Sequence, residues 1–552
     1  MRKWLMLCAL LSIIILAAAC AAPADSGSDT ASSSDTAAAD GETSEGAVLR
    51  LGINAADLSS LDPHFASGTQ DRTVVSMVFN GLVRYSPGDA PNIEPDLATA
   101  IPEPEATDDG KQVWTFELRQ GVMCHAGPET EAYELTADDV VYSLQKSANP
   151  DRSAFAGEYD GMTVEKVDDY TVSITMDTPL SPVLFLPKIA DYAGGFIVCS
   201  QAIEAVGDEA FKTHPVGTGP FMFESYTPQD RVVLTANPDY FRGAPKLAGV
   251  EGRYMPDISS RELGLRAGEL DVIHGLDEAQ WVDAISGEEG LAVDVFGVGE
   301  VATIYFNIDA EPFDKPEVRK AIAYALNRDA FLALFGPGIA DNVYSPVPAQ
   351  FMDGGLTKDD VDALDLEYAY DPEMARELLA EAGLADGFSF PVVSSEMNAY
   401  RKVYEAMQAQ LAEVGIDMQV DVVDHSSMHS LIRDDANPVV VYVAFRPNAD
   451  VYLTRFFHSD SIVVTGAKPD TNFSHYAAID DLIDSARAET DEAAQIELWK
   501  EAQVQILEDM VAYPLMYQNQ IYARSDKVDY GHPLNAIMNL NPQITEMTTI
   551  GQ

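Results

Sequence analysis

Two histidines four residues apart form the pair of side chains with the clearest potential for chemistry. His425 and His429 would share one face of a helix, and Asp421 and Asp424 lie close by in the sequence. Imidazole nitrogens at this spacing can hold a metal ion. A solvated turn leading into a helix explains the same four residues without a metal. We favour that simpler interpretation, so the sequence predicts no metal site.

Motifs for covalent or nucleotide chemistry are missing. The chain contains no G-x-S-x-G, H-E-x-x-H or P-loop pattern, and Gly217 and Gly219 do not complete a dinucleotide fingerprint. Carboxylate pairs such as Asp138-Asp139 carry little information, because Asp and Glu account for 89 of the 552 residues. We therefore expect a protein that is not an enzyme and needs no cofactor.

The charge and composition narrow the class of protein. The 34 Lys and Arg residues against 89 Asp and Glu residues give a net charge of 34 − 89 = −55. A surface this acidic repels nucleic acid, so we expect no nucleic-acid partner. A hydrophobic content of 47% in a chain of 552 residues predicts several folded domain-sized units.

The first residues are typical of an export signal. Arg2 and Lys3 precede an almost wholly apolar run from Trp4 to Ala19, which is too short for a confident membrane span. Three alanines then lead to Cys20, as in a bacterial lipoprotein signal, so we expect residues 1–20 to end at a lipidated Cys20. An ordinary signal peptide cleaved nearby is the alternative.

The segment from 21 to 47 favours the lipoprotein interpretation. It consists mainly of Ala, Ser, Asp, Gly, Thr and Glu and has no aromatic residue. Such a composition cannot bury enough apolar surface to fold, so we expect a disordered tether between the anchor and a folded body. Cys124 and Cys199 remain in the body, where either a disulfide or two buried thiols would fit.

The remaining sequence predicts an α/β body. Residues 388–393 form a strand-like run, 400–414 place apolar residues at helical spacing, and 416–422 alternate as a strand does. Gly415 ends the helix between them. A strand, helix and strand with short connections predict a βαβ unit with parallel strands.

Other helices and strands are indicated by capping residues at their ends or by the spacing of their apolar residues. Thr136 and Asp139 resemble a capping box, and Asp371-Pro372 with Gly383 bracket a second helix. Apolar spacing predicts one helix over 316–335, and alternation predicts strands over 114–118 and 172–176.

Several short stretches are spread over about 500 residues, from about Leu49 to the C-terminus. They are Leu61-Asp62-Pro63-His64, Val78-Phe79-Asn80-Gly81-Leu82-Val83, Trp114 to Val122, Leu135 to Val140, Pro215 to Phe221, Asn237 to Phe241, Pro312 to Ile322 and Leu378 to Gly383. Together these stretches resemble the extracytoplasmic solute-binding proteins of the peptide/nickel class (family 5) that serve ABC importers. Each stretch alone is weak, but their order and spacing make coincidence improbable.

The resemblance implies a two-lobed periplasmic-binding-protein-like α/β fold of the class II, or cluster C, type with an extra inserted domain. Carried onto this chain, lobe I takes residues 48–88, 197–297 and 511–552. The inserted domain takes 89–196, and lobe II takes 298–510. The lobes are expected to close on a ligand by a hinge motion.

The same resemblance implies a ligand site made by loops at strand ends that face the cleft. The expected ligand-binding residues follow three strands, and they are His64 and Phe65; Ser394, Ser395, Glu396 and Asn398; and Phe445, Arg446, Asn448 and Asp450. Arg446 would favour a ligand with a carboxylate. Asp450 would either pair with Arg446 or bind an amine.

The chain departs from the dipeptide-binding members of the family at both anchor positions. Ser394-Ser395 stand near the position where those members place an Arg, and Arg446-Pro447 stand near the position where they place an Asp. This leaves a peptide held largely through its backbone as the leading ligand. An oligosaccharide or another small solute is the alternative, since Tyr442, Phe445 and Tyr452 could contact a sugar.

The expected function is therefore an extracellular substrate-binding lipoprotein of an ABC importer. Its partners would be a peptide or another small solute, the ABC permease subunits, and the membrane through the lipid anchor. We expect a monomer on the outer face of the cell membrane or in the periplasm. A secreted hydrolase and a sensory receptor subunit are the competing interpretations.

Overall fold

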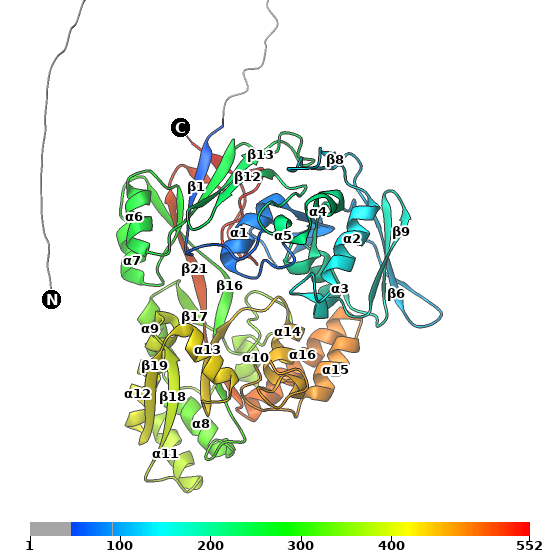
Figure 1. Cartoon of the computed structure of the whole chain (residues 1–552). Helices are drawn as coiled ribbons and strands as arrows, with labels where there is room; N and C mark the ends of the chain where they lie inside the picture. Colours follow the sequence, from blue (N-terminus) through cyan, green and yellow to red (C-terminus); the bar gives the residue numbers. More distant parts are fainter. Residues whose placement is uncertain (1–45, 91, 552) are drawn as a thin grey trace, which may run out of the picture. The chain divides into compact units, whose positions relative to one another are not determined.

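The computed structural model describes residues 46–90 and 92–551, and the backbone alone is described at 298 and 299. The predicted signal peptide, Cys20 and all but the last two residues of the predicted tether lie outside these ranges. The residues from Gly46 onward form one compact unit (Figure 1). Among the helices described, none combines the length and the apolar character that crossing a membrane requires.

A nine-stranded mixed sheet is the largest element of the fold. Along its main path the strand order is β12 (Phe221–Thr227), β13 (Arg231–Ala236), β14 (Gly249–Tyr254), β1 (Val48–Ile53), β15 (Val272–His274), β21 (Ala512–Ser525), β16 (Leu291–Phe306) and β20 (Val439–Ala444), with β17 (Ala340–Asn342) paired to β21. β1 lies parallel to both β14 and β15, whereas β16 runs antiparallel to β20 and β21.

The strands β16 and β21 connect the two ends of the molecule shown in Figure 1. They pair from Leu291 with Ser525 to Tyr305 with Ala512. Because β16 is 16 residues long and β21 is 14, one antiparallel pair reaches from the strands β1 and β15 to β17 and β20. The register shifts between Phe296 and Glu300, so the pair is irregular near its middle.

Residues 105–176 contain a separate four-stranded sheet. Its order is β5 (Glu105–Ala106), β6 (Gln112–Glu117), β10 (Thr171–Met176) and β9 (Met162–Asp168), and all its pairs are antiparallel. The predicted strands over 114–118 and 172–176 are thereby confirmed. Cys124 and Cys199 form a disulfide, with their Cα atoms 6.0 Å apart, which decides between the two alternatives that the sequence left open.

Short strand pairs complete the sheets. They are β2 (Asn80–Gly81) with β11 (Phe196–Ile197), β3 (Val83–Tyr85) with β4 (Ile93–Pro95), β7 (Met123–Cys124) with β8 (Tyr133–Glu134), and β22 (Val528–Asp529) with β23 (Thr549–Ile550).

The predicted βαβ unit is confirmed. β18 (Phe388–Ser395) and β19 (Ile416–Val423) pair in parallel, and the helix α12 (Asn398–Glu413) connects them. Gly415, with φ of +90°, adopts the left-handed conformation that follows a helix end. The buried face of α12 includes Val403, Met407 and Leu411, which is the period of four that the sequence shows.

Capping residues fix the helix ends that the sequence predicted. The Asp371 carboxylate accepts hydrogen bonds from the backbone N–H groups of Glu373 and Met374, at 3.0 Å each, at the start of α11 (Pro372–Glu381). Asp139 accepts from the Thr136 N–H at 3.0 Å at the start of α2 (Ala137–Ser147).

The predicted single helix over 316–335 is wrong, because the chain breaks it in two. α8 (Pro316–Ala325) ends before Leu326, whose backbone is extended, and α9 (Arg328–Phe335) begins anew. The Asn327 side chain accepts a hydrogen bond from the Ala330 N–H and so caps the second helix. A local polar cap therefore overrides the continuous apolar spacing.

The remaining helices divide between the two ends of the β16–β21 pair in Figure 1. Those before β16 are α1 (Thr69–Val78), α3 (Pro182–Phe185), α4 (Ser200–Val206), α5 (Asp208–Phe211), α6 (Ile258–Arg266) and α7 (Ala279–Ser286). Those after β17 are α10 (Lys358–Ala363), α13 (His425–Arg433), α14 (Ala449–Phe457), α15 (Asp480–Ala488) and α16 (Glu492–Glu508).

A fully buried ion pair ties the segment after β1 to α2. Lys146 Nζ lies 2.7 Å from an oxygen of Asp62, and neither side chain has any exposed surface. Lys146 also donates to the Arg152 carbonyl oxygen at 3.2 Å. Burial of two charges is costly unless both stay paired, so removal of either partner leaves an uncompensated charge in the core.

We expect Lys146→Met to lower the free energy of unfolding by about 3–5 kcal/mol, because it leaves the Asp62 carboxylate buried alone. Denaturant titration of the purified protein measures this loss. The exposed Lys166→Met is the control, with an expected change within about 0.5 kcal/mol. A loss for Lys146→Met as small as the control's would contradict the account.

Candidate ligand-binding site

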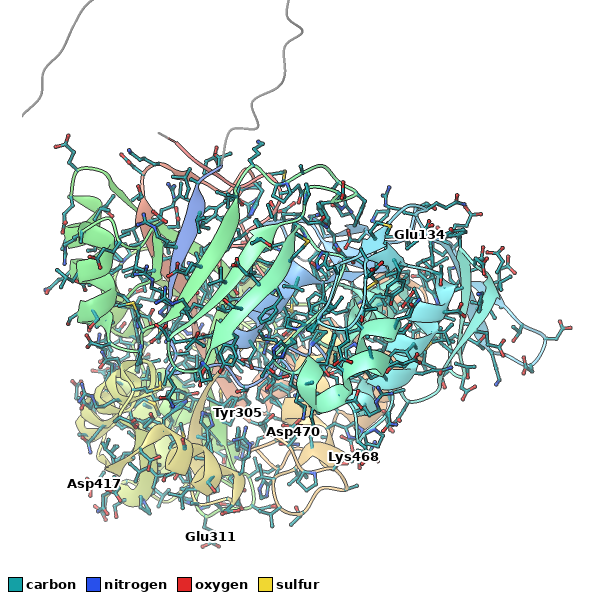
Figure 2. The ribbon with its side chains drawn as sticks, turned by 45° about the horizontal axis from the view of Figure 1, so that its top comes forward. Glu134, Tyr305, Glu311, Asp417, Lys468 and Asp470 are labelled. Carbon is teal, nitrogen blue, oxygen red and sulfur yellow. A yellow bond between two sulfur atoms is a disulfide. The ribbon has the colours of Figure 1, made fainter. Side chains whose placement is uncertain are left out.

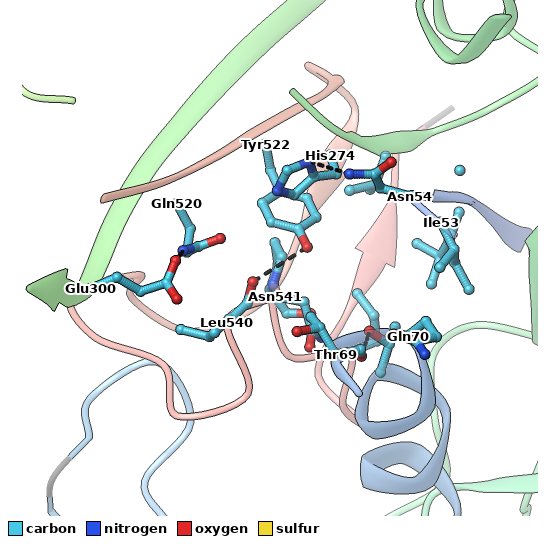
Figure 3. Close-up of a pocket in the computed structure, with 16 residues that line it drawn as sticks. Ile53, Asn54, Thr69, Gln70, His274, Glu300, Gln520, Tyr522, Leu540 and Asn541 are labelled. Atoms are coloured by element: carbon cyan, nitrogen blue, oxygen red, sulfur yellow. Dashed lines mark hydrogen bonds between the residues drawn. The ribbon is translucent and has the colours of Figure 1, made fainter. Parts of the chain in front are cut away.

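A cavity of about 280 Å³ lies where β1, α1, β15 and β21 meet (Figure 3). Its lining residues come from six segments, and they are Leu51, Gly52, Ile53 and Asn54; Thr69, Gln70 and Thr73; Val272 and His274; Glu300 of β16; Gln520 and Tyr522; and Leu540, Asn541, Pro542 and Ile544. The polar groups come from side chains that are distant in sequence.

A larger cavity of about 500 Å³ lies between residues 67–193 on one side and 442–455 on the other. The first side contributes Ser67, Arg72, Ala154, Phe155, Glu158, Tyr159, Leu184, Pro187, Lys188, Tyr192 and Ala193. The second contributes Tyr442, Val443, Ala444, Phe445, Arg446, Pro447, Asn448, Val451 and Arg455, and Glu300 and Leu540 complete the wall. Segments from both ends of the β16–β21 pair therefore enclose this space.

Glu300 belongs to the walls of both cavities, as does Leu540. Glu300 lies in β16 beside the register shift, and one of its carboxylate oxygens accepts a hydrogen bond from Gln520 Nε2 at 3.1 Å (Figure 3). Burial raises the pKa of Glu300, whereas the Gln520 hydrogen bond and the positive charge of Arg446 act in the opposite direction. A carboxylate thus lies at the junction of the two spaces.

Arg446 presents its guanidinium to the larger cavity. Nη1 donates to the Phe445 carbonyl oxygen at 2.8 Å, and the guanidinium carbon lies 4.8 Å from the centre of the Phe456 ring. The Nε–H is buried and has no hydrogen-bond partner among the residues that the structure describes. A buried donor without a partner is costly, and a carboxylate would satisfy it.

Three more cations line the larger cavity. Arg72 donates to the Tyr192 hydroxyl at 2.8 Å, Lys188 donates to the Glu158 carbonyl oxygen at 2.6 Å, and Arg455 lies 3.9 Å from a Glu158 carboxylate oxygen. The wall therefore carries four cationic side chains against the carboxylates of Glu158 and Glu300.

This excess of positive charge contrasts with the net charge of −55 for the whole chain. Many of the described acidic side chains are exposed, and two of them, Glu311 and Asp417, point away from the fold (Figure 2). A cationic cavity inside an anionic protein concentrates the local field on the site and favours an anionic group there.

The smaller cavity offers neutral polar groups. The Tyr522 hydroxyl donates to the Leu540 carbonyl oxygen at 3.3 Å, and a His274 ring nitrogen lies 3.5 Å from Asn54 Nδ2 (Figure 3). Burial, aided by Arg261, lowers the pKa of His274 to about 4, so its imidazole is neutral near pH 7. This space suits an uncharged polar part of a ligand.

Three of the residues expected from the sequence line the larger cavity. Phe445, Arg446 and Asn448 follow β20, and the Asn448 side chain also accepts from the Val451 N–H at 3.0 Å, which caps α14. Asp450 does not line either cavity. Its carboxylate pairs with Arg487 at 3.3 Å, and not with Arg446.

The loop after β18 lies elsewhere. Ser394 and Ser395 have no exposed surface, and the Ser395 hydroxyl lies 3.0 Å from His425 Nδ1. Glu396 is exposed and accepts from the Ser395 hydroxyl at 3.3 Å. Asn398 is exposed, and its Nδ2 donates to Glu278, just before α7, at 3.3 Å. None of the four lines the two cavities described above.

His64 and Phe65 follow the first strand, as expected, but they also lie outside both cavities. His64 has no exposed surface, and its Nε2 lies 2.9 Å from the Phe196 carbonyl oxygen. Lys146 Nζ lies 3.3 Å from His64 Nδ1 and 5.5 Å from the centre of the Phe65 ring. The buried ion pair of Lys146 and Asp62 holds this segment in the core.

Sequence reasoning missed Glu300, Arg72, Lys188, Gln520 and Tyr522. No local motif marks these residues, because the pairing of β16 with β21 and the placement of α1 bring them together from distant segments. Glu300 stands close to Gly297 and Gly299 in a strand that is mainly apolar, although it also contains Asp294 and Thr303. That break in the apolar pattern is the one signal that could have drawn attention to it.

Comparisons with known sequences identify the family. The family model described as bacterial extracellular solute-binding proteins, family 5 Middle, matches residues 92–462. The dipeptide-binding protein of Escherichia coli K12 is 30% identical over 466 residues, which cover 80% of this chain and 83% of that protein.

Solved structures give the same result. The MoaA binding protein of A. tumefaciens R10, solved with mannopinic acid, is 38% identical with a TM-score of 0.76, and the match covers 92% of this chain and all of that one. The DppA periplasmic binding protein of Helicobacter pylori, solved with the peptide STSA, is 25% identical with a TM-score of 0.73 and covers 92% and 98%. The chain has the two-lobed α/β fold of these proteins and belongs to the family 5 bacterial extracellular solute-binding proteins.

Proposed function

We propose that this protein binds a carboxylate-bearing solute of the peptide class between its lobes and delivers it, chemically unchanged, to an ABC permease. Membership of the solute-binding family supports the transport role. The name of the Escherichia coli relative, a dipeptide-binding protein, supports the ligand class. The protein acts as a monomer and needs no cofactor.

The cationic wall of the larger cavity is the observation that carries this proposal. Arg72, Lys188, Arg446 and Arg455 outnumber the two carboxylates there, although the chain as a whole is strongly acidic. The unpartnered Arg446 Nε–H supports a direct contact with a ligand carboxylate. Phe445 and Asn448, on the same loop, would contact the ligand beside it.

Glu300 favours a zwitterionic ligand, which carries an ammonium group as well as a carboxylate. Its carboxylate lies at the junction of the two cavities, where an ammonium group of the ligand would be paired and shielded from water. An ammonium group there would offset the cost of keeping this partly buried carboxylate ionised. In this arrangement the carboxylate end lies in the larger cavity and the remainder extends toward the smaller one.

Mannopinic acid or a related conjugate is the second candidate ligand. MoaA, solved with that compound, shares 38% identity with this chain over its full length. The neutral polar groups of the smaller cavity, Asn54, His274 and Tyr522, would contact the hydroxyl groups of such a solute. An oligosaccharide without a charged group would leave Arg446 unpaired, so we place it behind both.

We propose that the lobes move about β16 and β21. The boundaries expected from the resemblance, at 297/298 and 510/511, fall within β16 and just before β21. The register shift between Phe296 and Glu300 supports a flexible point there, because a disrupted ladder bends more easily than a regular one. The proposal keeps the domain boundaries expected from the resemblance. Lobe I comprises 48–88, 197–297 and 511–552, the inserted domain comprises 89–196, and lobe II comprises 298–510.

We also propose that the protein is held outside the cell by lipid on Cys20, with 21–47 as the tether. The apolar run before Cys20 and the polar composition after it support this interpretation. More than one acyl chain on a single residue anchors a protein stably at a membrane surface.

Arg446→Gln should weaken binding of peptides with a free carboxyl terminus by about 10- to 100-fold, because a charge-assisted hydrogen bond is lost. Calorimetric titration with matched tripeptides, carboxylate and amidated, measures the effect, and mannopinic acid forms a parallel series. The exposed Arg401→Gln is the control. Equal affinities of the unaltered protein for both forms of the peptides would contradict a carboxylate site.

Glu300→Gln should stabilise the free protein at pH 7 while weakening ligand binding. The raised pKa of Glu300 means that the folded protein keeps a proton there more readily than the unfolded chain does, so ionisation at higher pH costs stability. The extra stability of Glu300→Gln over the unaltered protein should shrink as the pH falls through that raised pKa. Denaturant titrations from pH 4 to 8, with the exposed Glu311→Gln as control, test this. A variant less stable than the unaltered protein at pH 7 would contradict it.

Cys20→Ala should release the protein from the membrane of a bacterial host that processes lipoproteins. Labelling of cells with radioactive palmitate and fractionation of membranes measure the outcome, with Cys8→Ala as the matched control within the signal. Retention of label in the Cys20→Ala protein would rule out this anchor.

A further inference from the structure

The two histidines of α13 lie against each other. Nε2 of His425 and Nε2 of His429 are 3.2 Å apart, and the two rings are nearly perpendicular, at 82°. Asp424 caps the helix by accepting from the Ser427 N–H at 3.0 Å, which places both histidines on one face, one turn apart.

This separation fits one shared metal ion. Two nitrogen ligands, each bound at the usual distance from a tetrahedral Zn²⁺, lie about 3.3 Å from each other. The observed 3.2 Å between the Nε2 atoms is close to that value without any movement of the helix. Imidazole is a preferred ligand of Zn²⁺, Ni²⁺ and Cu²⁺, whereas Mg²⁺ and Ca²⁺ prefer oxygen.

A second set of contacts orients His425 as a metal ligand requires. Its Nδ1 lies 3.0 Å from the Ser395 hydroxyl, which in turn donates to a Glu396 carboxylate oxygen at 3.3 Å. An Nδ1–H that donates to Ser395 leaves the Nε2 lone pair free. Metal-bound histidines commonly donate their other ring N–H to a hydroxyl, carbonyl or carboxylate, which fixes the tautomer.

We propose that His425 and His429 bind one divalent transition-metal ion, of the Zn²⁺, Ni²⁺ and Cu²⁺ class, with water in the other coordination positions. Within the described residues, no group of three or more His, Cys, Asp or Glu side chains is arranged to hold a metal. The site is therefore an open, two-histidine site. It lies beside the larger cavity, since the His429 ring is 5.5 Å from that of Tyr442, which lines it.

Titration of the chelator-treated protein with Ni²⁺ tests this proposal. Millimolar Ca²⁺ in the buffer competes for the many carboxylates, so that the Ni²⁺ binding that is measured reports on nitrogen ligands. We expect one equivalent to bind, and we expect His425→Gln and His429→Gln each to abolish it. Ser395→Ala should weaken it by about 10-fold, because it removes the contact that orients His425. The exposed His214→Gln should leave it unchanged.

An equivalent that survives in the double variant His425→Gln/His429→Gln would overturn the proposal, as would its loss in His214→Gln. A spectroscopic measurement on the unaltered chain guards against a variant that fails to fold. Electron paramagnetic resonance of one equivalent of Cu²⁺ should show coupling to two imidazole nitrogens. A spectrum with oxygen ligands alone would overturn the proposal independently of any variant.

Discussion

The antiparallel pairing of β16 with β21 is the constraint on which the rest of the structure depends. These strands belong to one sheet with β1 and β15 on one side and with β17 and β20 on the other, so a single set of backbone hydrogen bonds runs between the two ends of the molecule. The pairing also places Glu300 from β16 next to Gln520 and Tyr522 from β21, more than 200 residues later in the chain. The cavity lined by Glu300, Gln520 and Tyr522 therefore depends on this long-range pairing.

Charge is distributed unevenly between the surface and the site. Many of the described acidic residues, such as Glu311 and Asp417, are exposed, whereas four cations line the larger cavity. The Arg446 guanidinium contacts the Phe456 ring and donates to the Phe445 carbonyl oxygen. Its buried Nε–H is left without a partner among the described residues and is available to a ligand. A ligand carboxylate that enters the cavity would therefore leave the repulsion of the acidic surface residues and meet the attraction of the cavity cations.

Local signals in the sequence are sufficient to predict individual helices and strands, but they do not predict how these elements assemble. The βαβ unit around Gly415 and the caps at Asp371 and Thr136 depend on neighbours within a few residues, so each was predictable. The break at Asn327 was missed because a single side-chain cap outweighed apolar spacing. Arg446, which lines the larger cavity, follows a buried strand and is therefore a candidate from the sequence alone. Glu300 and Arg72 reach the same cavity through pairings that no local pattern records. His64 follows the first strand, but the buried Lys146 holds it in the core.

A crystal structure of the protein with a free-acid tripeptide tests the central claim most directly. We expect density for the intact peptide where the two cavities meet at Glu300, with the peptide carboxylate within hydrogen-bonding distance of Arg446. A peptide bound elsewhere on the molecule, or one recovered in cleaved form from the crystals, would contradict it.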